Sequence, residues 1–329
     1  MKALFKVRPA TMIAIAVLTA FALLPFLSEG YVLSNWRDVM LLALFALSLD
    51  LFWGRTGILS FGHATFFGLG AYGMAIATTR FGIDPAWASL AGLGVGVGMA
   101  VLVAAMVGYF MIYGGVRGAY FTIVTLAMTI VANNIAIGWS SVTGGDSGLI
   151  GVPPFQAFGV VFASPAQSFW LVLCILGLCL CGAMRVMNGR VGLVLAAIRD
   201  SEVKAATLGY RTPLILLATF VASAAIAAVA GAIYATGTGF VAPDMIALLL
   251  STEVIIWVAV GGSGSLVGAV IGTVVVWHLQ QKISSISITA WPIAIGGFFI
   301  LLVLVFPKGL PAFAFSLWRR VKPRKGGQA

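Results

Sequence analysis

The sequence predicts an all-α polytopic membrane protein with about ten transmembrane helices, some of them interrupted by glycine. Of its 329 residues, 61% are hydrophobic and only 9% are charged, whereas soluble domains carry roughly 45–50% apolar and about 25% charged residues. The apolar residues fall into separate runs of about 20, the length that an α-helix needs to cross the hydrocarbon core of a bilayer. The whole chain, 1–329, is interpreted as a single transmembrane domain.

The candidate spans follow one another with short polar or glycine-rich segments between them. They lie at 9–28, 36–53, 58–79, 86–113, 119–139, 168–187, 213–236, 245–260, 266–284 and 290–306. The third and the eighth are the weakest, because glycines interrupt the former and the latter is short. Small residues allow membrane helices to pack closely, and the denser glycine clusters at 54–73 and 261–272 predict broken or re-entrant helices.

The placement of the basic residues predicts the orientation of the chain. If the N-terminus lies in the cytoplasm and every span crosses, only Arg37, Arg80 and Lys282 of the 19 basic residues fall on the outer side. This is the bias that the positive-inside rule requires. Both termini, including a basic tail at 307–329, are therefore expected in the cytoplasm. Topology accounts for the net charge of +10, so a nucleic-acid partner is not expected.

The segment 188–212, between the sixth and seventh spans, is the largest predicted cytoplasmic loop. Its charged residues are Arg190, Arg199, Asp200, Glu202, Lys204 and Arg211. Asp200 or Ser201 can cap a short helix whose first turn is acidic, and Gly209 ends it. The preceding piece carries an apolar stripe. Such a helix pair suits the groove of a cytoplasmic partner protein; the alternative is a helix that lies on the lipid headgroups.

Two acidic residues are predicted inside spans, where an ionisable group is costly and marks a candidate functional position. Asp50 lies near the cytoplasmic end of its span beside Arg55, so a structural ion pair and a role in gating are both open. Glu253 lies in the middle of its span. It is the better candidate for lining a translocation path or bridging two helices.

Other polar residues are weaker candidates for the same path. His63 could contact a substrate, although a hydrogen-bonded role beside a glycine break is the more ordinary interpretation. Asn133 and Asn134 could line the path or bridge helices. The external, turn-rich loop at 140–152 could form an outer gate or a contact for a binding protein. The candidate residues of this loop are Thr143, Gly144, Gly145 and Asp146.

The sequence predicts neither a catalytic site nor a metal site in this chain. It has two histidines and three cysteines, and their spacing fits no metal-binding pattern. No G-x-x-x-x-G-K-[ST] phosphate loop occurs, and the glycine-rich run at 261–268 lacks the lysine that such a loop directs to a phosphate. If ATP drives this protein, another chain must bind it.

Six stretches carry a resemblance to a known family. They are LSLDLFWGRTGILSFGHATFFGLGAYG (47–73), GVRGAYFTIVTLA (115–127), TGGDSGLIGVP (143–153), GRVGLVLAAIRDSEVKAATLGY (189–210), EVIIWVAVGGSGSLVGAVIG (253–272) and FPKGL (306–310). In this order, and over nearly the whole chain, the sequence resembles the LivM-type permeases. These are the membrane subunits of bacterial ABC importers for branched-chain amino acids and related compounds.

The resemblance implies a fold related to that of the vitamin B12 importer permeases, in a bacterial inner membrane. The loop at 188–212 then corresponds to the coupling helix that docks into the ATPase. The residues expected to serve this coupling are Arg190, Arg199, Asp200, Ser201, Glu202, Lys204 and Gly209. The implied partners are a distinct, LivH-like second permease, two cytoplasmic ATPase subunits that bind ATP and Mg, a periplasmic substrate-binding protein and the membrane lipid.

The substrate stays open between a branched-chain amino acid, urea, a short amide and an aromatic acid. On the residues alone, a secondary transporter driven by an ion gradient would also use broken helices and a carboxylate such as Glu253. It would not need the capped cytoplasmic helix pair. An intramembrane enzyme is disfavoured, because the spans offer too few acids, bases and nucleophiles.

Overall fold

The computed structural model describes residues 9–28, 30–81, 84–286 and 296–297. Its long helices are α1 (Pro9–Leu27), α2 (Tyr31–Thr56), α3 (His63–Arg80), α4 (Pro85–Tyr113), α5 (Ala119–Gly138), α7 (Pro165–Met187), α10 (Thr212–Thr238), α11 (Leu248–Gly261) and α12 (Leu266–Ile286). The short helices are α6 (Ser140–Thr143), η1 (Gly145–Ser147), α8 (Arg190–Asp200), α9 (Glu202–Thr207) and η2 (Pro243–Met245). Apart from 296–297, the predicted tenth span and the basic tail lie outside the described residues.

The all-α, polytopic prediction is confirmed for the described part of the chain, where eight segments are long and apolar enough to cross a membrane. These eight match every predicted span except the third and the tenth. The third is present as α3, but its first five predicted residues, 58–62, are not helical. Polar residues such as His63 and Arg80 lower the mean hydropathy of α3. Most of its 18 residues are nevertheless buried, because α3 lies inside the helix packing.

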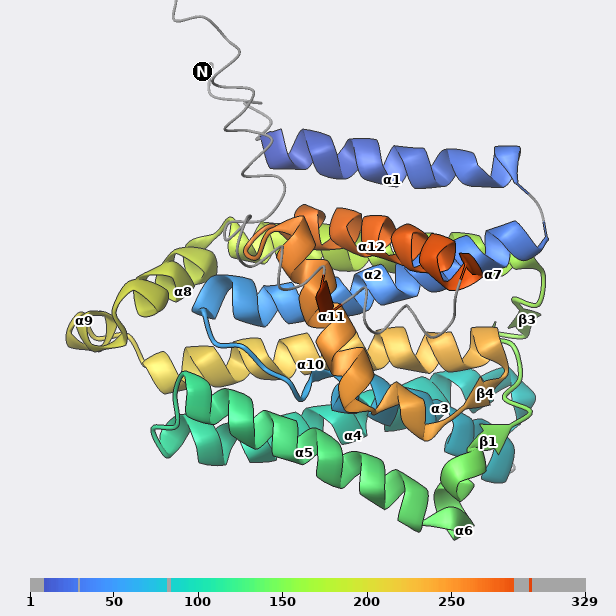
Figure 1. The fold of residues 1–329 in the computed structure, drawn as a ribbon, viewed down its shortest axis with the longest axis horizontal. Helices are drawn as coiled ribbons and strands as arrows, with labels where there is room; N and C mark the ends of the chain where they lie inside the picture. Colours follow the sequence, from blue (N-terminus) through green and yellow to red (C-terminus); the bar gives the residue numbers. More distant parts are fainter. Residues whose placement is uncertain (1–8, 29, 82–83, 287–295, 298–329) are drawn as a thin grey trace, which may run out of the picture.

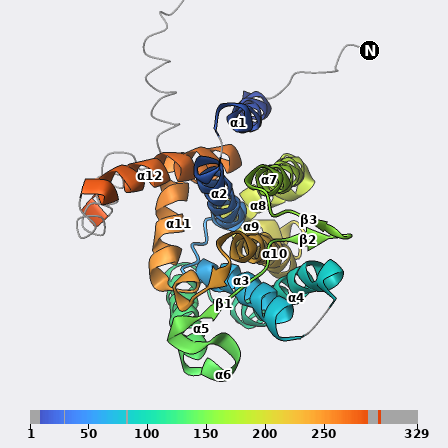
Figure 2. The same ribbon diagram turned by 90° about the vertical axis from the view of Figure 1, so that its right-hand side faces the viewer.

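The centre of the molecule is the packing of α10 against α2, α3 and α4, with α10 surrounded by other helices (Figure 2). Glycines let α3 and α10 touch through their backbones. A Cβ at Gly70 would overlap the carbonyl of Ala228, and a Cβ at Gly231 would overlap the carbonyl of Phe67. Close backbone approach of this kind stabilises membrane helix pairs. The glycines within α3 therefore serve packing and do not break the helix.

The predicted helix breaks occur at two turns. Gly57 ends α2 with a φ of 75°, and the chain stays non-helical up to Gly62. Gly262 and Gly264, with φ of 85° and 90°, form the turn between α11 and α12, and positive φ values favour glycine because it has no Cβ. The prediction of broken helices is confirmed at these turns. It is wrong within α3 and α12, which continue through their glycines.

The two ends of the helix bundle differ (Figure 1). α8 and α9 project from one end, while four short strands lie at the other. The strands form two antiparallel pairs, β1 (Leu149–Ile150) with β4 (Phe240–Val241) and β2 (Gln156–Ala157) with β3 (Val160–Val161). We call the end with α8 and α9 the coupling end, after the role that the sequence resemblance implies for this loop, and the opposite end the strand end.

Charge separates along the same axis. At the coupling end, seven basic residues outnumber three acidic ones: Arg55, Arg117, Arg185, Arg190, Arg199, Lys204 and Arg211 against Asp50, Asp200 and Glu202. Toward the strand end, the acidic residues Asp38, Asp84, Asp146 and Asp244 accompany the basic residues Arg37, Arg80 and Lys282. Consecutive long helices run in opposite directions between the two ends. The excess of basic residues at the coupling end therefore agrees with the excess that the sequence predicts for the cytoplasmic segments.

Candidate functional site

The coupling-end loop folds as the two short helices that the sequence predicts. Gly192, Leu195 and Ile198 of α8 are buried against the rest of the chain. The Ser201 hydroxyl accepts a hydrogen bond from the backbone N–H of Lys204 at 3.3 Å, which caps the start of α9. Of the two predicted caps, Ser201 is therefore the correct one.

The ends of this loop also follow the prediction. Asp200 is the last residue of α8, and its side chain is exposed. Gly209 has a φ of 89° just after α9, and α10 starts at Thr212 with Pro213 in its first turn. Proline is tolerated there because the first N–H groups of a helix have no intrahelical partner.

Arg199 anchors the end of α8 to the end of α2. Its Nη1 donates a hydrogen bond to the Gly54 carbonyl at 2.9 Å, and its side-chain stem lies over Gly57. A guanidinium carries a full charge, and a hydrogen bond from a charged donor is stronger than a neutral one. Movement of α8 is thereby connected to the point where α2 ends.

Asp50 continues this connection to the turn between α11 and α12. Its carboxylate is buried, and Oδ1 accepts a hydrogen bond from the Gly264 N–H at 2.6 Å. The ion pair with Arg55, one of the two possibilities left open by the sequence, is absent: the ion pairs seen between described residues are Arg37–Asp38 and Arg117–Glu202. The backbone N–H satisfies Oδ1 instead, which Gly264 permits by its close approach to α2. The other oxygen, Oδ2, is buried and has no hydrogen-bond partner among the described residues.

Gly54 is the point where these contacts meet. A Cβ at Gly54 would overlap both the Asp50 carboxylate and the backbone nitrogen of Gly264. Only a glycine therefore lets α2 and the α11–α12 turn approach closely enough for the Asp50 hydrogen bond.

Glu202 anchors α9 to a second group of helices. It forms a bidentate ion pair with Arg117, with Nε–Oε2 and Nη2–Oε1 distances of 2.7 and 2.8 Å. It also accepts a hydrogen bond from the Thr212 hydroxyl at 3.2 Å. The hydrogen bonds from Arg117 lower the pKa of Glu202, and partial burial opposes them. Glu202 thus holds α9 to the α4–α5 loop and to the start of α10.

Arg117 was not predicted to have a role, because its partner lies 85 residues away in the sequence. Its Nη1 also donates to the carbonyls of Ile112 and Val116, at 2.9 and 3.0 Å. These bonds hold the guanidinium in place at the end of α4. A fixed arginine facing a carboxylate with two parallel hydrogen bonds is a specific contact.

The outward face of α8 and α9 carries large apolar side chains. Leu193, Val203 and Leu208 are 73%, 74% and 76% exposed. Lys204 is exposed as well. Large apolar side chains that are this exposed are typical of a site where a protein or a membrane binds. Arg199, through Gly54, and Glu202, through Arg117, connect the two helices that carry these side chains to the rest of the chain.

His63 lies at the start of α3 and is fully buried. The hydroxyls of Ser48 and Ser223 donate their protons to the carbonyls of Phe45 and Ser48. Nε2 of His63 lies 2.9 Å from the Ser48 hydroxyl and 3.4 Å from the Ser223 hydroxyl, and the tautomer of the ring sets which group donates. His63 therefore joins α3 to α2, and in this conformation its side chain reaches no open path.

Threonines of α5 hold the non-helical segment between α2 and α3. The Phe61 N–H donates to the Thr125 hydroxyl at 3.1 Å, and the Thr129 hydroxyl donates to the Phe61 carbonyl at 3.0 Å. The Thr122 hydroxyl donates to the Leu59 carbonyl at 3.1 Å. Backbone groups that a glycine break leaves free inside a membrane protein need such partners. In the sequence, only the three- and four-residue spacing of these threonines could have indicated this role.

The remaining path candidates lie on α5 and α11. Asn133 on α5 is half-buried, with an Oδ1 that has no hydrogen-bond partner among the described residues, and Asn134 is exposed. Glu253 is half-buried on α11, a helix that contacts α5. An apolar cavity of about 580 Å³ lies between α3, α4 and α5, and none of these three residues lines it.

The outer loop folds as a hydrogen-bonded turn at the strand end. The buried Thr143 hydroxyl donates to the Ala136 carbonyl at 2.6 Å and accepts from the Gly145 N–H at 3.2 Å. Gly144 and Gly145 have φ of 79° and 64°, whereas Asp146 is exposed. Thr143 and the glycines therefore shape the turn, and Asp146 is the one of these four that faces outward.

Comparison with known protein families identifies the family of this chain. Residues 31–307 match the family described as "Branched-chain amino acid transport system / permease component". The chain belongs to this permease family. The match covers α2 to α12, including the coupling-end loop, so the two short helices and their anchors are part of the family domain.

Individual relatives agree with this assignment. The permease is 26% identical to the high-affinity branched-chain amino acid transport system permease protein LivM of Escherichia coli (strain K12), over 90% of this chain and 73% of that protein. It is 25% identical to the corresponding LivH protein of Salmonella typhimurium, over 82% of this chain and 90% of that protein. No solved structure matches the chain. These relatives are permease components, and the described residues hold no cluster of three or more potential metal ligands.

Proposed function

We propose that this chain is a transmembrane permease subunit of an ATP-driven importer in a bacterial inner membrane. It forms the path together with a second, LivH-like permease, and the solute is small and polar, such as a branched-chain amino acid. Two cytoplasmic ATPase subunits bind ATP and Mg, and a periplasmic binding protein delivers the solute. The chain itself performs no catalysis.

The observation that carries this proposal is the construction of the coupling end. Arg199 and Glu202 hold α8 and α9 to two separate groups of helices, and Leu193, Val203 and Leu208 of the same loop are exposed. A helix pair that is fixed from inside and apolar outside can transmit the movement of a docked protein to both groups. The similarity of the chain to both LivM and LivH supports a pair of related permeases.

The test is to replace the outward apolar side chains by charge. In Val203→Asp and Leu208→Asp, we expect loss of the ATPase from tagged purifications in mild detergent, and solute uptake at background level. Both positions are exposed, so insertion into the membrane should be unchanged. Ile150→Asp is the matched control, because Ile150 is 80% exposed at the strand end, and it should retain the ATPase.

The rival proposal, a secondary transporter, gives a different result. Uptake that follows an imposed ion gradient, with no ATPase recovered and no effect of Val203→Asp, would contradict the importer proposal. The substrate is then identified by measuring the affinity of the periplasmic binding protein for each candidate class separately: branched-chain amino acids, urea, short amides and aromatic acids.

A further inference from the structure

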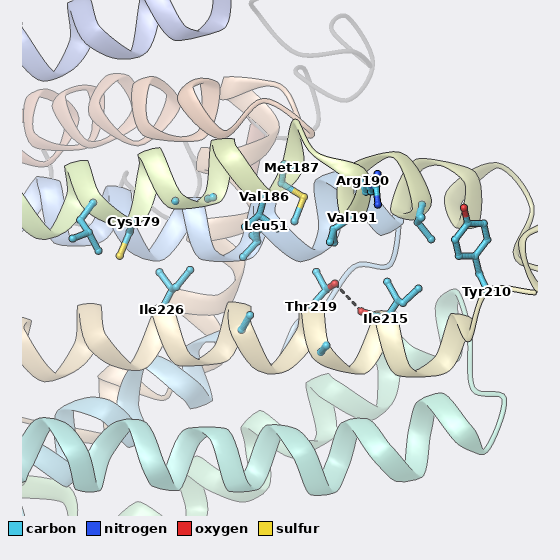
Figure 3. A pocket seen from close by; sticks show the side chains of 16 residues that line it. Leu51, Cys179, Val186, Met187, Arg190, Val191, Tyr210, Ile215, Thr219 and Ile226 are labelled. Carbon is cyan, nitrogen blue, oxygen red and sulfur yellow. Dashed lines mark hydrogen bonds between the residues drawn. The ribbon is translucent and has the colours of Figure 1, made fainter.

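A deep apolar groove lies between α7 and α10 at the coupling end, and α8 closes one end of it (Figure 3). Its volume is about 590 Å³. Cys179 and Ile226 mark its inner end, and Arg190 and Tyr210 mark its mouth beside α8. The groove is separate from the anchors Arg199 and Glu202, neither of which lines it.

The interior of this groove is apolar. Thr219 is one of the few polar residues in its wall, and its hydroxyl already donates to the Ile215 carbonyl at 2.7 Å. Ala218 and Ala222 face the groove one helical turn apart and are exposed. Their small side chains keep the groove open. An apolar cavity without free polar groups has no partners for ordered water, so its natural occupant is a hydrocarbon chain.

The length of the groove fits one leaflet of a bilayer. It extends along α7 from Leu178 to Met187, about 14 Å at a helical rise of 1.5 Å per residue. Half of a hydrocarbon core of about 30 Å is about 15 Å. With its mouth at the coupling end, the groove has the length of an acyl chain whose headgroup lies at the membrane surface beside α8.

The charge at the mouth specifies the headgroup. Arg190 is exposed and forms no ion pair with the acidic residues of the described chain. The first turn of α8 contains no acidic residue. Tyr210 lines the mouth with Arg190, and the exposed Arg211 follows it. A guanidinium binds phosphate through several parallel hydrogen bonds, so the mouth complements an anionic headgroup.

We propose that this groove binds one anionic phospholipid from the leaflet at the coupling end. One acyl chain lies between α7 and α10, and the lipid phosphate lies beside Arg190 and Tyr210. The bound lipid contacts α7, α8 and α10 at once and stabilises the position of α8. This proposal does not depend on the transported solute or on the ATPase.

The acyl-chain site is tested by filling the groove. The full chain, with the subunits that copurify, is released from nanodiscs of phosphatidylglycerol and phosphatidylcholine, and native mass spectrometry counts the retained lipids. We expect one retained phosphatidylglycerol for the unmodified chain and none for Ala218→Leu/Ala222→Leu. The control Ala16→Leu/Ala20→Leu changes two exposed alanines with the same spacing on α1 and should retain the lipid. Equal retention by both double variants would refute the site.

The headgroup contact is tested separately with Arg190→Gln. Loss of one charged hydrogen-bonding group should lower the preference for phosphatidylglycerol over phosphatidylcholine about tenfold. Lys204→Gln removes an exposed charge on α9, outside the groove, and should leave the preference unchanged. An unchanged preference in Arg190→Gln would overturn the anionic assignment. Disulfide crosslinking of Ala222→Cys to another subunit would show that protein, not lipid, covers the groove.

Discussion

At the scale of the residue, Gly54 and Glu202 decide how the coupling end is connected. Gly54 provides the carbonyl that Arg199 binds and the space that the Asp50–Gly264 hydrogen bond occupies. Glu202 joins α9 to Arg117 and Thr212. Sequence reasoning singled out Asp50, Arg199 and Glu202 as candidate functional residues. It could not find their partners, because hydrogen bonds to a distant backbone group leave no pattern in a single sequence.

We expect Gly54→Ala to be strongly harmful. The added methyl group would overlap the Asp50 carboxylate and Gly264, and overpacking of this kind costs about 1–3 kcal/mol of folding free energy. We expect Gly54→Ala to lower both the solute uptake in cells and the thermal stability of the purified chain. Gly94→Ala is the control, because a Cβ at Gly94 meets no atom within 4 Å. Equal stability of Gly54→Ala and Gly94→Ala would contradict the inference that only glycine at position 54 allows α2 and the α11–α12 turn to approach this closely.

The Glu202 anchor should depend on pH in one direction. Its pKa in the folded chain is lower than the ordinary 4.5, chiefly because of the Arg117 hydrogen bonds. The stabilisation is therefore complete above pH 4.5 and is lost as the pH falls through the lowered pKa. Thermal unfolding should show Glu202→Gln less stable than the unmodified chain at neutral pH, and the difference should shrink below pH 4.5. Asp200→Asn is the control, because it removes an exposed carboxylate of the same loop and leaves the Glu202–Arg117 ion pair in place.

At the scale of the element, local sequence chemistry accounts for α8 and α9, and packing accounts for α3. The Ser201 cap, the glycine stop and the proline start were readable because each acts within a few residues. The predicted helix at 58–79 was wrong over 58–62, where α5 threonines bind the backbone instead. Periodicity cannot reveal a segment whose hydrogen bonds go to another helix.

The capping interaction gives a prediction for α9 alone. Ser201→Ala should remove the hydrogen bond to the Lys204 N–H and destabilise α9 by about 1 kcal/mol. Hydrogen exchange of the α9 amides should then be faster by about fivefold. Ser201→Asn keeps a capping oxygen and should restore the protection. Equal exchange in the alanine and asparagine variants would contradict the cap.

At the scale of the whole molecule, the chain has a basic end with the coupling loop and an opposite end with the strands (Figure 1). The two ends are connected by helices that alternate in direction. The coupling end carries both anchors and the mouth of the α7–α10 groove. The features proposed to bind another protein or a lipid therefore lie at the same end of the fold.

This arrangement predicts opposite accessibility of two exposed positions. In a chain whose three cysteines are replaced by serine, Lys204→Cys should react with a membrane-impermeant maleimide only in inverted vesicles. Asp146→Cys at the strand end should react in intact cells, because the positive-inside rule places the coupling end in the cytoplasm. The two positions serve as controls for each other. Labelling of both from the same side would contradict the orientation.

The amino-acid sequence was sufficient to predict the membrane class, the order of the spans, the charge bias and the capped helix pair. Each of these depends on composition or on contacts between near neighbours in the chain. Only the tertiary structure decided which partners Asp50, Arg199, Glu202 and His63 have, and where the groove between α7 and α10 lies. These features join residues far apart in the sequence, and backbone geometry, through glycines such as Gly54 and Gly70, sets the distances between them. Helix packing is therefore the physical reason that the second set could not be predicted.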